Sequence, residues 1–332
     1  MSYTIRRFDS DEAWLEFRKG VLGASDMPTV CRVNPHKTEY QLWMLKTGRT
    51  APEPTNAAMI RGHEMEPVVV DYFVRETGAR IFKNSEGNWI AQSNEYPWLG
   101  VSPDRLYTLP GEPHSMNHAR ILECKSTYGD YSPDNYPKEW YIQTMYQMGV
   151  MGIKHGTIGC LRMFPELTLF TVPVEFNLEQ YNEIVAKGTD FWKNHVEADV
   201  EPEMLSGEDV LRKYPKEHKD AKYQADERAL ALLKEYVRYS REEEAAKAVK
   251  DSCADQLKIL MGEAGTMYRI NSKMKEENLI SFKKSKDSLK VDTEILQKEF
   301  PEVFRECSFE TEGKRTFRVS PNVKKLIEEK II

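Results

Sequence analysis

Two residues in the stretch ILECKS, Glu123 and Lys125, have the types and spacing needed for chemistry at a metal ion or a phosphate. On a β-strand, residues two apart project from the same face, and Cys124 points to the other. Burying a carboxylate and an ammonium beside apolar neighbours is costly unless they pair or bind a ligand. The tripeptide alone leaves two interpretations open: an edge-strand salt bridge, which is the commoner one, or part of a polar site.

A second acidic residue, Asp104, follows a strand-like run in WLGVSPDRL. An aspartate in such a turn usually only hydrogen-bonds its own backbone. Its place in the chain changes the interpretation. The order of strand, SPD turn, return strand and then the strand with Glu123 and Lys125 can bring the three side chains together at one end of a sheet.

Glu66 is a fourth candidate, in a helix predicted over about 57–77. It lies three residues before Val69, seven before Phe73 and seven after Met59. The helical period therefore places it on the apolar, inward-facing stripe. An inward glutamate is either paired with a buried cation or used as a ligand.

Three carboxylates and a lysine suit phosphodiester hydrolysis. Oxygen ligands favour Mg²⁺ or Mn²⁺, and such an ion would polarise the phosphate and lower the pKa of an attacking water. The lysine could orient that water or neutralise developing charge. Soft-metal chemistry is not indicated, because the five cysteines form no CxxC pair and no His/Cys cluster has suitable spacing.

The elements that would position these residues predict an α/β (α+β) fold, with a mixed central sheet flanked by helices. Three helical pieces are expected within 10–48, with Ser10 and Thr38 as N-caps. The remaining expected elements are short strands between 78 and 108, a central strand at 119–127, a helix at 138–151, two strands within 155–176 and a helix at 178–196.

The composition changes near residue 205, which predicts a core at 1–205 and a C-terminal extension at 206–332. Residues 215–265 are rich in Lys, Glu and Ala and predict a helical hairpin or one long helix. Residues 267–290 hold seven Lys or Arg against three acids, 7 − 3 = +4, and predict a small basic strand pair. We expect the helical part of the extension to be a packing or oligomerisation element rather than a DNA clamp.

The formal net charge of −6 does not indicate nucleic-acid binding, although a nuclease can bind DNA through a local basic surface. No window approaches the roughly 20 apolar residues of a membrane helix, and the first residues do not resemble a signal peptide. We therefore expect a soluble, cytoplasmic protein with no membrane partner.

These motifs resemble the PD-(D/E)xK nuclease superfamily, with SPD at 102–104 and ECK at 123–125. The resemblance is closer to YqaJ-type phage recombinases, the group of lambda exonuclease, and covers about residues 10–200. The matching segments are WLEFRKGVLGASDM (14–27), NPHKTEYQLWMLKTGR (34–49), RGHEMEPVVVDYF (61–73) and YIQTMYQMGVMG (141–152).

The resemblance implies a restriction-endonuclease-like core and a role for each matching residue. Asp104, Glu123, Lys125 and Glu66 would be catalytic, and the metal ligands would be Asp104, Glu123, Glu66 and the Cys124 carbonyl. Arg18, Ser25 and Ser102 would bind the 5′-phosphate of a DNA end, and Gln143 matches the motif glutamine. Ser25 is also expected to head a helix N-terminus, which favours phosphate. Met145 stands where the family helix commonly has a second glutamine.

The implied function is a Mg²⁺-dependent (or Mn²⁺-dependent) 5′-to-3′ exonuclease on linear duplex DNA, leaving 3′ single strands for annealing. Members of the group form trimeric rings and work with a single-strand annealing protein, so the resemblance implies a homo-oligomer and such a partner. It also implies a phage- or prophage-encoded protein in a bacterial host. Two alternatives stay open: an endonuclease of the same fold, or a non-catalytic protein that binds DNA ends.

Overall fold

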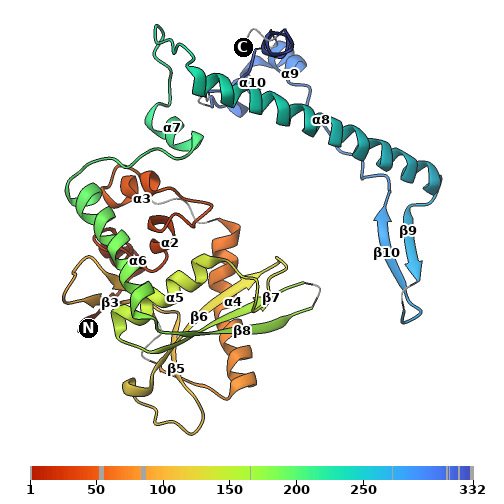
Figure 1. Cartoon of the computed structure of the whole chain (residues 1–332). Coiled ribbons are helices and arrows are strands. Elements are labelled where there is room, and N and C mark those ends of the chain that lie inside the picture. Colours follow the sequence, from red (N-terminus) through yellow and green to blue (C-terminus); the bar gives the residue numbers. More distant parts are fainter. Residues whose placement is uncertain are drawn as a thin grey trace. The chain divides into compact units, whose positions relative to one another are not determined.

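The computed structural model describes residues 2–329, except for 52–55, 84–86, 165, 271, 312, 314 and 321. The chain divides into two compact units, Met1–Lys213 and Tyr214–Ile332, both drawn in Figure 1. The first unit carries every candidate site residue. The division falls eight residues later than the predicted boundary at 205, 213 − 205 = 8.

A five-stranded mixed sheet forms the centre of the first unit, in the order β2-β5-β6-β7-β8. Its strands are β2 (Arg80–Ile81), β5 (Arg105–Thr108), β6 (Arg120–Thr127), β7 (His155–Arg162) and β8 (Thr168–Glu175). The β6 and β7 strands are parallel, and the other neighbours are antiparallel. The predicted mixed α/β fold is therefore confirmed, with the ECK strand at the middle of the sheet.

Helices cover both faces of this sheet (Figure 1). On one face, α4 (Ala57–Thr77) packs Val69 and Phe73 against Leu122 of β6. On the other face, α5 (Lys138–Met151) packs against Ile121, and α6 (Leu178–Phe191) lies behind it. Alternate residues of β6 therefore face different helices.

The predicted return strand after the SPD turn does not pair with the strand before it. That earlier strand, β4 (Gly100–Val101), belongs to a second sheet of order β1-β3-β4, with β1 (Tyr3–Arg7) and β3 (Trp89–Ser93). The chain crosses from this small sheet to the central one at the SPD turn. Asp104 is thus held by two sheets rather than at the tip of a hairpin.

The three predicted N-terminal helices are present as α1 (Asp11–Lys19), α2 (Met27–Val30) and α3 (Glu39–Lys46). Ser10 and Thr38 each accept a hydrogen bond from a first-turn backbone N–H, so both predicted N-caps are confirmed. In α4, Met59 is exposed, so the prediction that it faces inward was wrong, whereas Val69 and Phe73 are buried as predicted.

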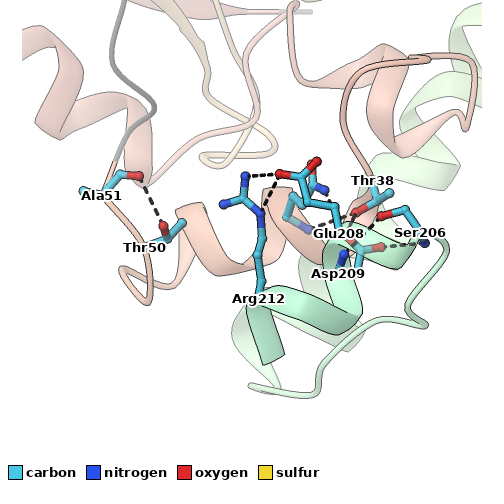
Figure 2. A network of polar contacts seen from close by, with 8 residues as sticks. Thr38, Thr50, Ala51, Ser206, Glu208, Asp209 and Arg212 are labelled. Atoms are coloured by element: carbon cyan, nitrogen blue, oxygen red, sulfur yellow. Dashed lines mark hydrogen bonds and ion pairs between the residues drawn. The ribbon is translucent and has the colours of Figure 1, made fainter. Parts of the chain in front are cut away.

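A buried carboxylate attaches α7 (Gly207–Lys213) to α3. Asp209 is fully buried, and its Oδ1 accepts hydrogen bonds from Thr38 Oγ1 at 2.8 Å (Figure 2) and from Gln41 Nε2 at 2.9 Å. Two backbone N–H groups before the helix donate to its Oδ2. Because four donors satisfy this carboxylate, α7 belongs to the first unit, and that is why the division falls after Lys213.

The second unit is built on one long helix, α8 (Glu227–Met261), rather than a helical hairpin. It continues into an antiparallel strand pair, β9 (Thr266–Ile270) and β10 (Glu276–Ser281). The helices α9 (Thr293–Glu299), α10 (Pro301–Cys307) and α11 (Asn322–Glu328) follow. Ion pairs such as Arg241–Glu328 hold α11 against α8. Among the described helices, none is both long and apolar enough to span a bilayer.

Candidate active site

Strand β6 presents Glu123 and Lys125 on its α5 face, as the two-residue spacing predicts. Glu123 is 5% exposed, and its Oε1 accepts a hydrogen bond from Lys125 Nζ at 2.5 Å. Cys124 packs instead with the residues under α4. Burial opposes the charged form of Lys125, but the negative charges of Glu123 and Asp104 outweigh it and raise the pKa of Lys125. The lysine therefore stays a cation in a largely buried setting.

Helix α5 supplies two glutamines to this pair. Lys125 Nζ donates to Gln143 Oε1 at 2.8 Å, and Gln147 Nε2 donates to Glu123 Oε2 at 2.8 Å. Residues four apart share one face of a helix, so both amides reach the same strand. Gln147 is 2% exposed, and its Oε1 has no hydrogen-bond partner in the described structure. Gln147 was not predicted from the sequence, although its spacing of four residues from Gln143 places both on one helix face.

Asp104 lies next to Glu123 and Lys125 because β5, which it precedes, pairs with β6. Its Oδ2 accepts a hydrogen bond from the Cys124 backbone N–H at 2.7 Å. Burial raises the pKa of Asp104 well above its usual value, Glu123 and Glu66 raise it further, and Lys125 opposes them. The structure thus gathers these charged groups near one end of the sheet.

Glu66 reaches this cluster from α4, and its carboxylate forms an ion pair with Arg105. Arg105 also donates to the Asp104 carbonyl at 2.6 Å. Of the two interpretations offered for an inward glutamate, the structure therefore shows pairing with a cation. Arg105 could not be identified as this partner from sequence spacing, because β5 brings it to α4 only in the folded chain.

The cluster contains oxygen atoms that could bind a metal ion, but its three carboxylates are not arranged to bind one together. Among the described residues, no group of three or more His, Cys, Asp or Glu side chains has the arrangement to hold a metal ion. Glu123 is paired with Lys125, and Glu66 with Arg105. Asp104 forms no ion pair in the described part of the chain, and the negative charges of Glu123 and Glu66 act on it together with the positive charge of Lys125. Two carboxylates and the Cys124 carbonyl have the donor chemistry of a hard divalent cation. Glu66 would have to leave Arg105 to join them.

Arg18 and Ser25 lie together, as the resemblance implies. The Arg18 guanidinium donates to Ser25 Oγ at 2.8 Å and lies over the Trp14 ring, 4.6 Å from its centroid. Ser102 instead donates to the Trp89 carbonyl, and no described hydrogen bond joins it to the other two. The three predicted pocket residues are therefore connected only in part.

The expectation that Ser25 heads a helix N-terminus was wrong. The helix that follows, α2, is a single turn of four residues, and its N-cap is Asp26. Because the macrodipole grows with aligned peptide units, one turn adds little attraction for phosphate. Any recognition of phosphate here depends on side chains.

Comparison with known proteins agrees with the motifs. Residues 13–154 match the YqaJ-like viral recombinase domain. Over 319 residues the chain is 23% identical to "Uncharacterized protein YqaJ" of Bacillus subtilis (strain 168), covering 92% of each chain. An alkaline exonuclease of Laribacter hongkongensis has a TM-score of 0.44 at 22% identity, covering 61% of this chain and 97% of that one.

A phage-related exonuclease of Haemophilus somnus 129PT has a TM-score of 0.40 at 12% identity, covering 54% of this chain and 96% of that one. The region matched by the family model, residues 13–154, contains the SPD and ECK motifs, α4 and α5. The similarity to the YqaJ-like viral recombinase domain therefore covers the part of the chain that holds the candidate site.

Proposed function

We propose that this chain is a metal-dependent deoxyribonuclease that digests linear duplex DNA from its ends. The observation that carries the proposal is the gathering of Asp104, Glu123 and Lys125 at one end of a buried sheet, with α5 amides beside them. Burying this many charged groups is costly. Binding of a metal ion and a phosphate by these groups would account for the cost of burying them.

The proposed chemistry assigns a part to each group. Asp104 and Glu123, with the Cys124 carbonyl, would hold Mg²⁺ or Mn²⁺, and Glu66 would join after leaving Arg105. The ion, when bound, would polarise the scissile phosphate and lower the pKa of the attacking water. Lys125 donates one N–H to Glu123 and one to Gln143. Because an ammonium has three donors, one is left for a phosphate oxygen or the water.

Recognition of the DNA end would fall to Arg18 and Ser25. Arg18 takes part in none of the ion pairs found among the described residues, yet it is held in place by Ser25 and Trp14. A pre-positioned guanidinium without an acidic partner suits a terminal phosphate. We include Ser102 in this pocket on the resemblance alone. A 5′-phosphate anchor would favour 5′-to-3′ digestion, leaving 3′ single strands for annealing.

The proposal includes two assembly features that rest on the resemblance alone. One is a homo-oligomer, a trimer in this group, and the other is a single-strand annealing protein as partner. Light scattering of the purified chain tests the first, and co-purification with a candidate annealing protein tests the second. A monomer at working concentration would remove the ring from the proposal.

A gel assay on end-labelled linear duplex, with Mg²⁺ or with a chelator, tests the activity. We expect Mg²⁺-dependent loss of the 5′-ended strand, faster from 5′-phosphorylated than from 5′-hydroxyl ends. Asp104→Asn and Lys125→Met should abolish cleavage, whereas Lys187→Met, at an exposed lysine of α6, should not. Equal cutting of closed circles would indicate an endonuclease. Binding to ends without Mg²⁺-stimulated cleavage would indicate an end-binding protein.

A further inference from the structure

A buried ion pair lies beside the proposed phosphate ligands, Arg18 at the end of α1 and Ser25 in the loop that follows. Lys46, the last residue of α3, places its Nζ 2.7 Å from Asp26 Oδ2, and their side chains are only 4% and 12% exposed. Neither residue was predicted from the sequence to have a role. A buried pair of this kind costs desolvation energy that the pairing does not always repay, so its presence needs a reason.

The Lys46 ammonium is fully occupied inside the protein. Besides Asp26, it donates to the backbone carbonyls of Arg18 at 2.9 Å and Val21 at 2.6 Å. Three acceptors match its three N–H groups, so none remains for a ligand. Its contacts tie the end of α3 to the end of α1 and to the loop between α1 and α2.

Asp26 also lies close to Arg18. Burial alone would raise the pKa of Asp26, but the charges of Lys46 and Arg18 lower it overall. Asp26 Oδ2 accepts a hydrogen bond from the Gly23 N–H at 2.9 Å. A Cβ at Gly23 would lie 3.2 Å from one Arg18 nitrogen and 3.5 Å from Asp26 Oδ2. The guanidinium and the carboxylate therefore lie beside the same glycine without forming an ion pair.

The loop is also fixed to the elements of the candidate active site. Leu22 exchanges backbone hydrogen bonds with Trp98 and Gly100, which lead through β4 to the SPD turn. Tyr146 of α5 donates its hydroxyl to the Leu22 carbonyl at 2.9 Å. Arg18, at the end of α1, and Ser25, in the loop that follows, thus flank a segment attached both to the chain that enters Asp104 and to the helix that bears Gln143.

We propose that Lys46 is a positioning residue that neutralises Asp26, so that Arg18 stays bonded to Ser25 and free to bind the 5′-phosphate of a DNA end. Without the ammonium, the nearest cation for the buried carboxylate is Arg18, and an arginine–carboxylate pair is strong and often bidentate. Arg18 would then turn from Ser25 to Asp26. This inference rests on the proposed end recognition.

The test compares Lys46→Met, Asp26→Asn and the double variant as full chains with Mg²⁺. For each, kcat/KM is measured on matched linear duplexes with 5′-phosphoryl and 5′-hydroxyl ends, and their ratio is the readout. We expect Lys46→Met to lower the ratio about tenfold or more, the size of one lost charge-assisted hydrogen bond. Asp26→Asn and the double variant should keep a ratio near that of wild type, because an amide does not attract Arg18. Lys187→Met serves as the matched lysine control.

Rescue by the second substitution separates this role from simple support of the loop. A double variant that stays as unselective as Lys46→Met would overturn the inference, and so would a Lys46→Met enzyme that keeps the wild-type ratio. If Lys46→Met does not fold, the end-preference ratio of the double variant is compared with that of Asp26→Asn. Equal ratios support the inference, and a much lower ratio in the double variant overturns it. A wild-type enzyme that cleaves without end preference overturns the proposed end recognition, and this inference with it.

Discussion

The two oxygens of Glu123 have separate donors, and the strength of one of these bonds can be measured. Lys125 donates to Oε1 and Gln147 to Oε2. Glu123 and Gln147 are 5% and 2% exposed, so water cannot replace the amide once it is removed. A hydrogen bond to a charged group contributes about 1.5–3 kcal/mol. We predict that Gln147→Met and Glu123→Met are coupled by this amount in the free energy of unfolding.

A single substitution would not reveal the bond. Gln147→Met removes the donor to Glu123, which destabilises, but it also removes the unpartnered Oε1 of Gln147. Relief of a buried unsatisfied acceptor returns about 1–3 kcal/mol, so the two effects nearly cancel. In a double-mutant cycle, Gln147→Met removes the unpartnered Oε1 from wild type and from Glu123→Met alike, so the contribution of Oε1 cancels. The unpaired Lys125 left by Glu123→Met drops out in the same way.

The assay is guanidinium unfolding followed by tryptophan fluorescence. All six tryptophans lie in the first unit, so the signal reports that unit even if the second unfolds separately. Thr144→Val serves as the control partner, because Thr144 is buried on α5 but bonds its own helix at the Trp140 carbonyl. Coupling between Glu123 and Gln147 below about 0.5 kcal/mol, the usual limit of additivity, would refute the geometry of the site.

Two further predictions concern the supports of the site. A Cβ at Gly149 would overlap the buried Tyr181 ring, so Gly149→Ala should destabilise by about 1–3 kcal/mol. Gly62 lies in an exposed part of α4, where a Cβ meets open space, so Gly62→Ala should raise Tm because alanine favours a helix. A higher Tm for Gly149→Ala than for Gly62→Ala would contradict this packing. Asp26 has a lowered pKa, so its contribution is present above about pH 4 and lost as pH falls through the folded-state pKa. The stability difference between wild type and Asp26→Asn should shrink as the pH falls below about pH 4; growth on acidification would contradict it.

The sequence by itself was enough for the features that depend on local periodicity. Alternation along β6 placed Glu123 and Lys125 on one face and Cys124 on the other, since side chains of a strand alternate whatever it pairs with. The caps at Ser10 and Thr38 were predictable because the bonded N–H lies only three residues away.

Partners distant in the chain were decided by the tertiary structure. The sequence did not predict that Glu66 would pair with Arg105, nor that Lys46 would lie buried against Asp26. Gln147 was missed as well: its spacing of four residues places it on the helix face of Gln143, but not that face against β6. Such contacts depend on strand register and on the packing of helices against the sheet, which set distances between residues that sequence spacing leaves free.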